Sequence, residues 1–198
     1  IKDAWDESSN NAHWRNRPAG KPFFAVFNHE VTHESSIFPK GGKPYERPPD
    51  GTDPAKVRLP AYHPDTPEFR TDRAHYYDQM ARLDGQVARL LAQLADDGLA
   101  EDTIVFYYGD NGGVLPRSKR FCFDSGLHVP LILTFPKKFQ GLAPGAAGSR
   151  VEAPVSFVDF APTVLSLAGA AAPKYFQGHA FAGPQKAAPQ TYAFCFRN

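Results

Sequence analysis

The chain has 198 residues, of which 42% are hydrophobic and 22% are charged, and its formal net charge is +1 at pH 7. This composition excludes a disordered chain, and the near-neutral charge argues against broad electrostatic capture of nucleic acid. No apolar run approaches the roughly 20 residues that a membrane-spanning helix needs, so no membrane span is expected. Cys122 and Cys195 are the only cysteines, too few for a disulfide framework. The sequence leaves the oligomeric state open.

The first predicted strand is a short apolar run, rich in aromatic side chains, at residues 23–27. Shortly after it comes His29-Glu30-Val31-Thr32-His33, a match to the zinc signature H-E-x-x-H. In that signature two histidines share one helix face, and the glutamate activates water. A helix is not expected here, because the preceding residues favour a strand and the two residues before the second histidine are β-branched. A zinc metalloprotease is therefore the least favoured function.

A proline-rich stretch at residues 37–67 predicts a long irregular loop that either serves a site or is an ordered surface loop. A helix is expected next, because Thr66 can cap it, Pro67 suits its first position and Gly98 suits its end. Apolar residues spaced by three and four give this helix one stripe, which we expect to face the core. The stripe consists of Tyr76, Met80, Leu83, Val87, Leu90 and Leu94. His75 lies off the stripe and is expected on the surface.

Two further apolar runs, at residues 104–108 and 129–135, predict two more strands. Because a helix connects the strand at residues 23–27 to the one at 104–108, these two strands should be parallel neighbours in an α/β fold. Their carboxyl ends would bring His33 and Asp110 to one edge of the sheet, where ligands bind in open α/β sheets. The sequence therefore predicts an α/β fold with a mainly parallel sheet flanked by helices.

A polar elbow, Gly109-Asp110-Asn111-Gly112-Gly113, follows the strand at residues 104–108, and a cationic loop at residues 117–120 comes next. Asp and Asn beside Gly are common turn formers, and a run of charges is often a solvated surface. Residues 114–116, however, do not continue as an alternating strand, which argues against a tight hairpin. Carboxylate and amide oxygens suit a hard divalent cation, while lysine and arginine suit an oxyanion. The pattern indicates a metal site that also receives a small anion.

The C-terminal part begins with a predicted helix start, because Ser156 and Asp159 have the spacing of a capping box. Asp159 is therefore expected to be a cap rather than a metal ligand. Gly169 suits the end of this short helix. Residues 191–196 predict one more strand.

These segments together resemble the second half of a sulfatase, of the type I, formylglycine-dependent family. The likeness rests on the order and spacing of short segments along nearly the whole chain. Those segments are the strand before His33, the helix up to Leu94, Asp110-Asn111-Gly112, Lys119, Asp124-Ser125-Gly126, Val129-Pro130 and Val158-Asp159-Phe160-Ala161-Pro162-Thr163. The resemblance implies that residues 1–198 form a single partial alkaline phosphatase-like domain, the C-terminal portion of a sulfatase catalytic domain.

The resemblance also implies roles for individual residues. Asp110 and Asn111 would be ligands of a divalent metal, most often calcium in such enzymes. Lys119 would bind a sulfate oxygen, and His33 would bind the sulfate or its bridging oxygen. The implied partner is a sulfated small molecule or saccharide, and the implied compartment is periplasmic, secreted or lysosome-like.

Some residues fit the resemblance less closely. Glu34 and Arg120 are weaker candidates for substrate binding, together with the proline-rich loop. His128 stands where the family has arginine before Val-Pro, and Cys122 stands where an aromatic or aliphatic residue is usual.

The nucleophile of the family has no counterpart in this sequence. Formylglycine arises in a Cys/Ser-x-Pro-x-Arg motif, and neither cysteine of the chain lies in one. The family's paired metal-binding aspartates and Lys-x-x-His segment are also missing. We therefore expect the part that bears the nucleophile to lie outside residues 1–198 and the isolated chain to be inactive. The alternatives are a phosphate or phosphonate ester hydrolase of the same superfamily and a non-catalytic metal-binding module.

Overall fold

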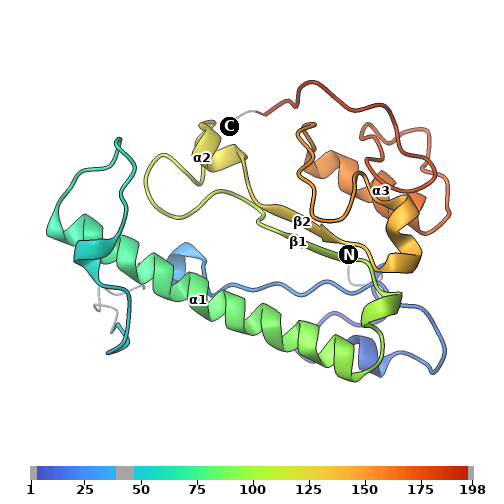
Figure 1. Ribbon diagram of the computed structural model, residues 1–198, viewed down its shortest axis with the longest axis horizontal. Coiled ribbons are helices and arrows are strands. Elements are labelled where there is room, and N and C mark those ends of the chain that lie inside the picture. The colour runs from blue at the N-terminus through green and yellow to red at the C-terminus, as the bar shows by residue number, and fades with distance from the viewer. Residues whose placement is uncertain (1–3, 39–46, 196–198) are drawn as a thin grey trace.

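The computed structural model describes residues 4–38 and 47–195. A long helix runs beside a two-stranded sheet, and the C-terminal segments gather near one end of that sheet (Figure 1). The helices are α1 (Pro67–Asp96), α2 (Asp124–Leu127) and α3 (Phe160–Leu167), and the strands are β1 (Val105–Tyr108) and β2 (Leu131–Thr134). Short 3-10 helices are η2 (Trp14–Asn16), η3 (Glu34–Ser36), η4 (Pro54–Lys56), η5 (Ala100–Asp102), η6 (Lys137–Leu142) and η7 (Phe157–Asp159). None of the described helices has the length and apolar character that spanning a membrane requires.

Helix α1 begins and ends where its sequence signals predicted. Thr66 Oγ1 accepts a hydrogen bond from the Phe69 amide at 3.3 Å, and Pro67 occupies the first turn. Gly98 has a φ of +70°, a left-handed conformation that glycine adopts without steric cost. The prediction for the apolar stripe was only partly right. Leu94 is buried and Met80 is exposed, while the other four residues of the stripe are half-buried.

The buried face near the start of α1 is polar, and the prediction of a surface position for His75 was wrong. His75 is 3% exposed and lies beside the buried Asp78 and Gln79. Asp78 accepts a hydrogen bond from the Thr52 amide at 2.7 Å, and the Gln79 side chain donates to the Ser36 carbonyl at 3.2 Å. The connecting segments therefore cover this face of α1 through specific hydrogen bonds, which helical periodicity does not reveal.

Strands β1 and β2 confirm two predicted strands but pair in antiparallel fashion, with Val105 opposite Thr134 and Tyr108 opposite Leu131. The connection between them contains only the four-residue α2. Parallel strands need a long crossover, usually a helix, so β2 instead runs back alongside β1 in the opposite direction. The mainly parallel sheet is not seen in the described residues. The strands predicted at residues 23–27 and 191–196 are not confirmed, because neither residues 23–27 nor residues 191–195 form a strand. Residue 196, the end of the last predicted strand, lies outside the described residues.

The C-terminal part is organised around Asp159, whose predicted capping role is confirmed. Asp159 is 1% exposed and closes a capping box with Ser156 at the start of η7, just before α3. Its carboxylate accepts hydrogen bonds from the Ser156 amide (2.9 Å), the His179 amide (2.8 Å) and the Gln190 side chain (3.0 Å). One buried carboxylate therefore ties the helix start to two later segments.

Candidate functional site

The elbow that follows β1 is held against the segment that leads through α2 to β2. The Gly112 amide donates to the Gly126 carbonyl at 3.1 Å, and the Lys119 amide donates to the Gly113 carbonyl at 2.9 Å. A Cβ atom on Gly112 would overlap the Ser125 carbonyl, so only glycine permits this approach. The elbow and the cationic loop therefore form one folded unit.

The cationic loop, residues 117–120, is clasped at its base and strained at both ends. The Ser118 hydroxyl donates to the Ser125 carbonyl at 2.5 Å, and the Ser125 hydroxyl donates to the Arg117 carbonyl at 2.5 Å. Arg117 and Arg120 have φ values of +66° and +72°. A left-handed conformation costs a non-glycine residue roughly 1 kcal/mol, and such strain clusters at functional sites.

Glu34 brings the cationic loop to the predicted histidine. Arg120 Nη2 lies 2.8 Å from one carboxylate oxygen of Glu34, and Lys119 Nζ lies 3.8 Å from the other. Glu34 begins η3, and His33 is the residue that caps this turn. The structure therefore gathers four of the six predicted site residues, although Glu34 and Lys119 are separated by more than 80 residues of sequence. The side chain of Lys119 is 20% exposed, so its charge is partly shielded from water.

Desolvation acts to raise the pKa of the Glu34 carboxyl, but the hydrogen bond from Arg120 and the charges of Arg120, Lys119 and His33 outweigh it. The pKa of Glu34 therefore lies below its ordinary value of 4.5. Because the folded-state pKa is depressed, the ion pairs stabilise the loop above pH 4.5 and are lost as the pH falls through the lower folded-state pKa.

We expect NMR titration of the Glu34 side-chain carboxyl to give a midpoint below 4.5, and Arg120→Gln to move that midpoint upward. Arg120 supplies the hydrogen bond and a positive charge, whereas the remote Arg150 pairs with Glu152. Arg150→Gln is therefore the matched control and should leave the midpoint unchanged. An unchanged midpoint in Arg120→Gln would contradict the pairing.

His33 has a defined hydrogen-bonding direction. Its Nδ1 accepts from the Ser35 amide at 3.3 Å and lies 2.9 Å from the Ser35 hydroxyl. An imidazole that accepts at Nδ1 carries its proton at Nε2 when it is neutral. The exposed ring of His33 therefore has Nε2–H as the donor for a bound group.

Asp110 and Asn111 come directly after the end of β1, and they lie on the same folded unit as Lys119. Asp110 is exposed and Asn111 is half-buried. A calcium ion takes roughly six to eight oxygen ligands, so this pair fits only part of a ligand set. In the described parts of the chain, no three His, Cys, Asp or Glu side chains gather in a way that could hold a metal ion.

The two histidines of the zinc signature do not share a helix face. Residues 21–32 are not helical, in agreement with the sequence-based expectation. His29 Nδ1 lies 2.9 Å from the Gln86 side chain on α1, whereas His33 Nδ1 faces Ser35. The motif therefore lacks the geometry on which its zinc-binding interpretation depends.

Sequence reasoning missed the aromatic partners of Arg117. The guanidinium of Arg117 lies 4.9 Å from the ring centre of Tyr62 and 4.2 Å from that of Phe123. Tyr62 belongs to the proline-rich loop, and the neighbouring His63 Nε2 lies 2.9 Å from the Pro116 carbonyl oxygen. The described part of this loop therefore packs against the cationic loop. No pattern in the sequence indicates that Tyr62 and Phe123 contact Arg117.

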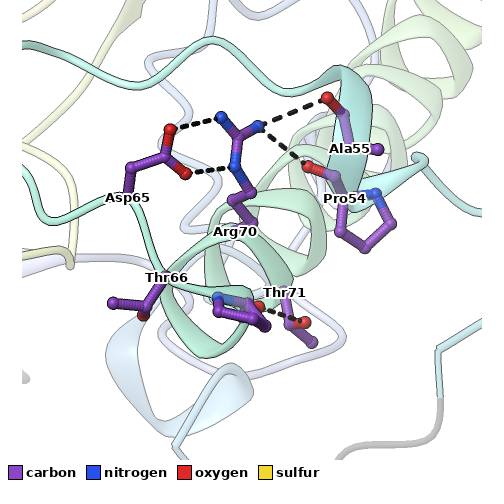
Figure 2. Close-up of a pocket in the computed structure, with 7 residues that line it drawn as sticks. Pro54, Ala55, Asp65, Thr66, Arg70 and Thr71 are labelled. Carbon is purple, nitrogen blue, oxygen red and sulfur yellow. Dashed lines mark hydrogen bonds and ion pairs between the residues drawn. The ribbon is translucent and has the colours of Figure 1, made fainter.

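A separate pocket of about 360 Å³ lies at the start of α1, lined by residues 54–55, 65–67 and 70–71 (Figure 2). Arg70 crosses it and pairs with Asp65, and the same guanidinium donates to the carbonyls of Pro54 and Ala55 at 3.3 Å each. Since these partners occupy the guanidinium, the pocket reads as a structural junction between the proline-rich loop and α1.

The domain has α/β structure, a clasped cationic loop with a histidine donor beside it, and two oxygen donors after a strand. Cations and a hydrogen-bond donor of this kind suit the binding of an oxyanion. The family model described as Sulfatase matches residues 6–170. The chain belongs to the sulfatase family, which implies an alkaline phosphatase-like α/β fold.

Individual relatives agree with this assignment. The ulvan-active sulfatase of Formosa agariphila is 41% identical over 96% of this chain and 36% of its own length. The human N-sulphoglucosamine sulphohydrolase is 33% identical over 64% of this chain and 24% of its own length. Arylsulfatase K of Danio rerio is 35% identical over 57% of this chain and 21% of its own length. The chain therefore spans about a third or less of the length of these relatives.

Proposed function

We propose that the chain is the C-terminal part of a type I sulfatase catalytic domain and that the complete enzyme is a sulfuric ester hydrolase. The observation that carries this proposal is the meeting of Lys119 and Arg120 with Glu34, directly beside His33, in a chain of the sulfatase family. Fixed cations and an imidazole donor match the needs of a sulfate group, which spreads negative charge over its oxygens.

In this proposal each site residue of the chain has its own role in binding or catalysis. Lys119 holds a sulfate oxygen and offsets the charge that develops as the S–O bond breaks. His33, with its proton at Nε2, donates a hydrogen bond to the bridging oxygen and so stabilises the negative charge that develops on the departing alkoxide. Glu34 restrains both cations between substrates, and Arg120 contributes to substrate binding.

The family implies a divalent metal and a formylglycine nucleophile, and both need residues from outside residues 1–198. Asp110 and Asn111 supply two of the oxygen ligands of a divalent metal, which we propose to be calcium, and further ligands come from the rest of the enzyme. A bound metal would add positive charge beside the sulfate. The formylglycine nucleophile likewise belongs to the rest of the enzyme, so residues 1–198 alone should not turn over.

The accessible surface supports the proposal of a partial domain. The chain exposes 14201 Å², whereas a folded monomer of 21.8 kDa exposes roughly 9,000 Å². Large apolar side chains on and beside the sheet contribute to this excess, among them Ile132 (58% exposed), Phe157 (46%) and Tyr108 (40%). We infer that the rest of the domain covers this surface and that its strands complete the mainly parallel sheet expected from the sequence.

The test compares the isolated chain with the full-length enzyme that contains it, on an aryl sulfate and the matching aryl phosphate. We expect the full-length enzyme to hydrolyse the sulfate faster than the phosphate, and the isolated chain to hydrolyse neither. Faster phosphate hydrolysis would favour the phosphatase alternative. Turnover by the isolated chain would show that the catalytic set is not divided as we propose.

The relatives suggest the substrate class. One is described as ulvan-active and another as acting on N-sulphoglucosamine, so we propose a sulfated saccharide as substrate of the complete enzyme. The periplasmic, secreted or lysosome-like compartment implied by the family resemblance remains part of the proposal.

A further inference from the structure

Beside the cationic loop, three aromatic rings and one guanidinium make consecutive contacts. Tyr62 contacts Arg117, Arg117 contacts Phe123 at 4.2 Å, and the Phe123 ring stacks on Phe121 with 20° between planes and 6.1 Å between centroids. Tyr62, Phe121 and Phe123 are 45%, 38% and 43% exposed. We call these four residues the aromatic–arginine platform. It presents three partly exposed aromatic rings and one cation, with the guanidinium lying over the rings of Tyr62 and Phe123.

The platform is held in place by the same contacts that shape the candidate site. Arg117 adopts a left-handed backbone conformation at the base of the clasp formed by Ser118 and Ser125. Strained backbone of this kind persists where the surrounding structure fixes it, and it often orients a functional side chain. Among the described residues, the ion pairs of the cationic loop join Lys119 and Arg120 to Glu34, whereas the guanidinium of Arg117 contacts the rings of Tyr62 and Phe123.

Charge distinguishes the platform from the other exposed apolar surface. The exposed side chains of Ile132, Phe157 and Tyr108 lie on and beside the sheet, as expected for a surface that the rest of the domain covers. The platform instead adjoins the cations of residues 117–120, which would lose hydration if a polypeptide buried them. Lys119 and Arg120 already pair with Glu34, and an anionic ligand would also give Arg117 a partner, so charge complementarity favours an anionic ligand over an apolar covering segment.

We propose that the aromatic–arginine platform is a subsite for a sulfated saccharide chain that extends away from Lys119. Aromatic faces pack against the apolar C–H faces of sugar rings, and the planar guanidinium of Arg117 offers paired donors to a sulfate or carboxylate on the chain. The row of Tyr62, Arg117, Phe123 and Phe121 is longer than one aryl ring. A saccharide of several rings would contact all of it, while a single aryl sulfate would reach only the part beside Lys119. This assignment rests on the proposed function, because it deepens the substrate class of the same site.

The test measures Kd by calorimetry on the full-length protein, which requires no turnover. The probes are a sulfated tetrasaccharide, its desulfated counterpart and phenyl sulfate. Arg117→Gln, Phe123→Ala and Tyr62→Ala should each weaken binding of the sulfated tetrasaccharide about tenfold and change phenyl sulfate binding little. Tyr62 lies on a different loop from Arg117 and Phe123, so it tests the subsite even where a change in the cationic loop disturbs folding.

Matched controls separate the subsite from general effects. Arg150→Gln removes an exposed arginine that pairs with Glu152, and Tyr175→Ala removes an aromatic side chain that is 80% exposed and contacts Phe176. Both should leave all three affinities unchanged. Equal losses for phenyl sulfate and tetrasaccharide, no loss in any platform variant, or equal binding of the desulfated probe would each overturn the subsite. Tight, platform-dependent binding without sulfate ester turnover would instead contradict the proposed function and leave the subsite standing.

Discussion

Lys119→Ala in the full-length enzyme should lower kcat/KM for a sulfate ester by about 100- to 1,000-fold, the loss typical of removing one fixed group that stabilises transition-state charge. The expectation follows from position: the Lys119 side chain is only 20% exposed and lies 3.8 Å from Glu34 on a clasped loop. A charge held in this way needs no reorganisation as the S–O bond breaks. Steady-state kinetics with an aryl sulfate measures the effect.

Lys138→Ala is the matched control for Lys119→Ala. Lys138 is 50% exposed and pairs with Asp102 beyond the far end of β2 from the elbow. Its loss should leave kcat/KM within about twofold of the unchanged enzyme, as expected of an exposed ion pair. Full activity of Lys119→Ala would remove lysine from the proposed site. A loss seen equally in Lys138→Ala would indicate a nonspecific effect on folding.

Gly126→Ala should reduce the free energy of unfolding by about 2–4 kcal/mol, because a Cβ atom there would overlap two backbone carbonyls, those of Phe121 and Ser118. The Ser118 carbonyl also accepts a hydrogen bond from the Phe121 amide at 3.1 Å, so moving it would break that turn of the cationic loop. The same change should also lower sulfate ester turnover, since the cationic loop would shift away from Glu34. Urea denaturation followed by circular dichroism measures the stability change.

Gly141→Ala provides the comparison for Gly126→Ala. A Cβ atom on Gly141 would meet no heavy atom within 4 Å, and Gly141 lies in η6 away from the cationic loop. We expect its urea midpoint to stay close to that of the unchanged chain. Similar midpoints for the two variants would show that the close approach at Gly126 is absent in solution.

The predictions from sequence succeeded where the structure depends on near neighbours. Thr66 and Gly98 mark the limits of α1 because cap hydrogen bonds and glycine conformations involve residues within one helical turn. Asp159 was recognised as a cap for the same reason. The spacing from Asp110 to Val129 identified the sulfatase family, since such motifs are read along the chain.

The predictions failed where the structure depends on contacts between segments that are far apart in the sequence. The strand at residues 104–108 was placed beside residues 23–27, but it pairs with β2 in the opposite direction. His75 was expected on the surface, but the connecting segments fold over that face of α1. Strand direction and burial depend on which segments meet in space, and apolar periodicity contains no information about the partner.

The sequence by itself determined the helix limits, the positions of β1 and β2, and the family, because these depend on local hydrogen bonds and on residue spacing. Only the tertiary structure decided that Glu34 meets Arg120, 86 residues later, and that Arg117 lies between the rings of Tyr62 and Phe123. Such contacts form when long-range packing closes large loops, and the free energy that selects them comes from burial and charge pairing among segments far apart in the chain.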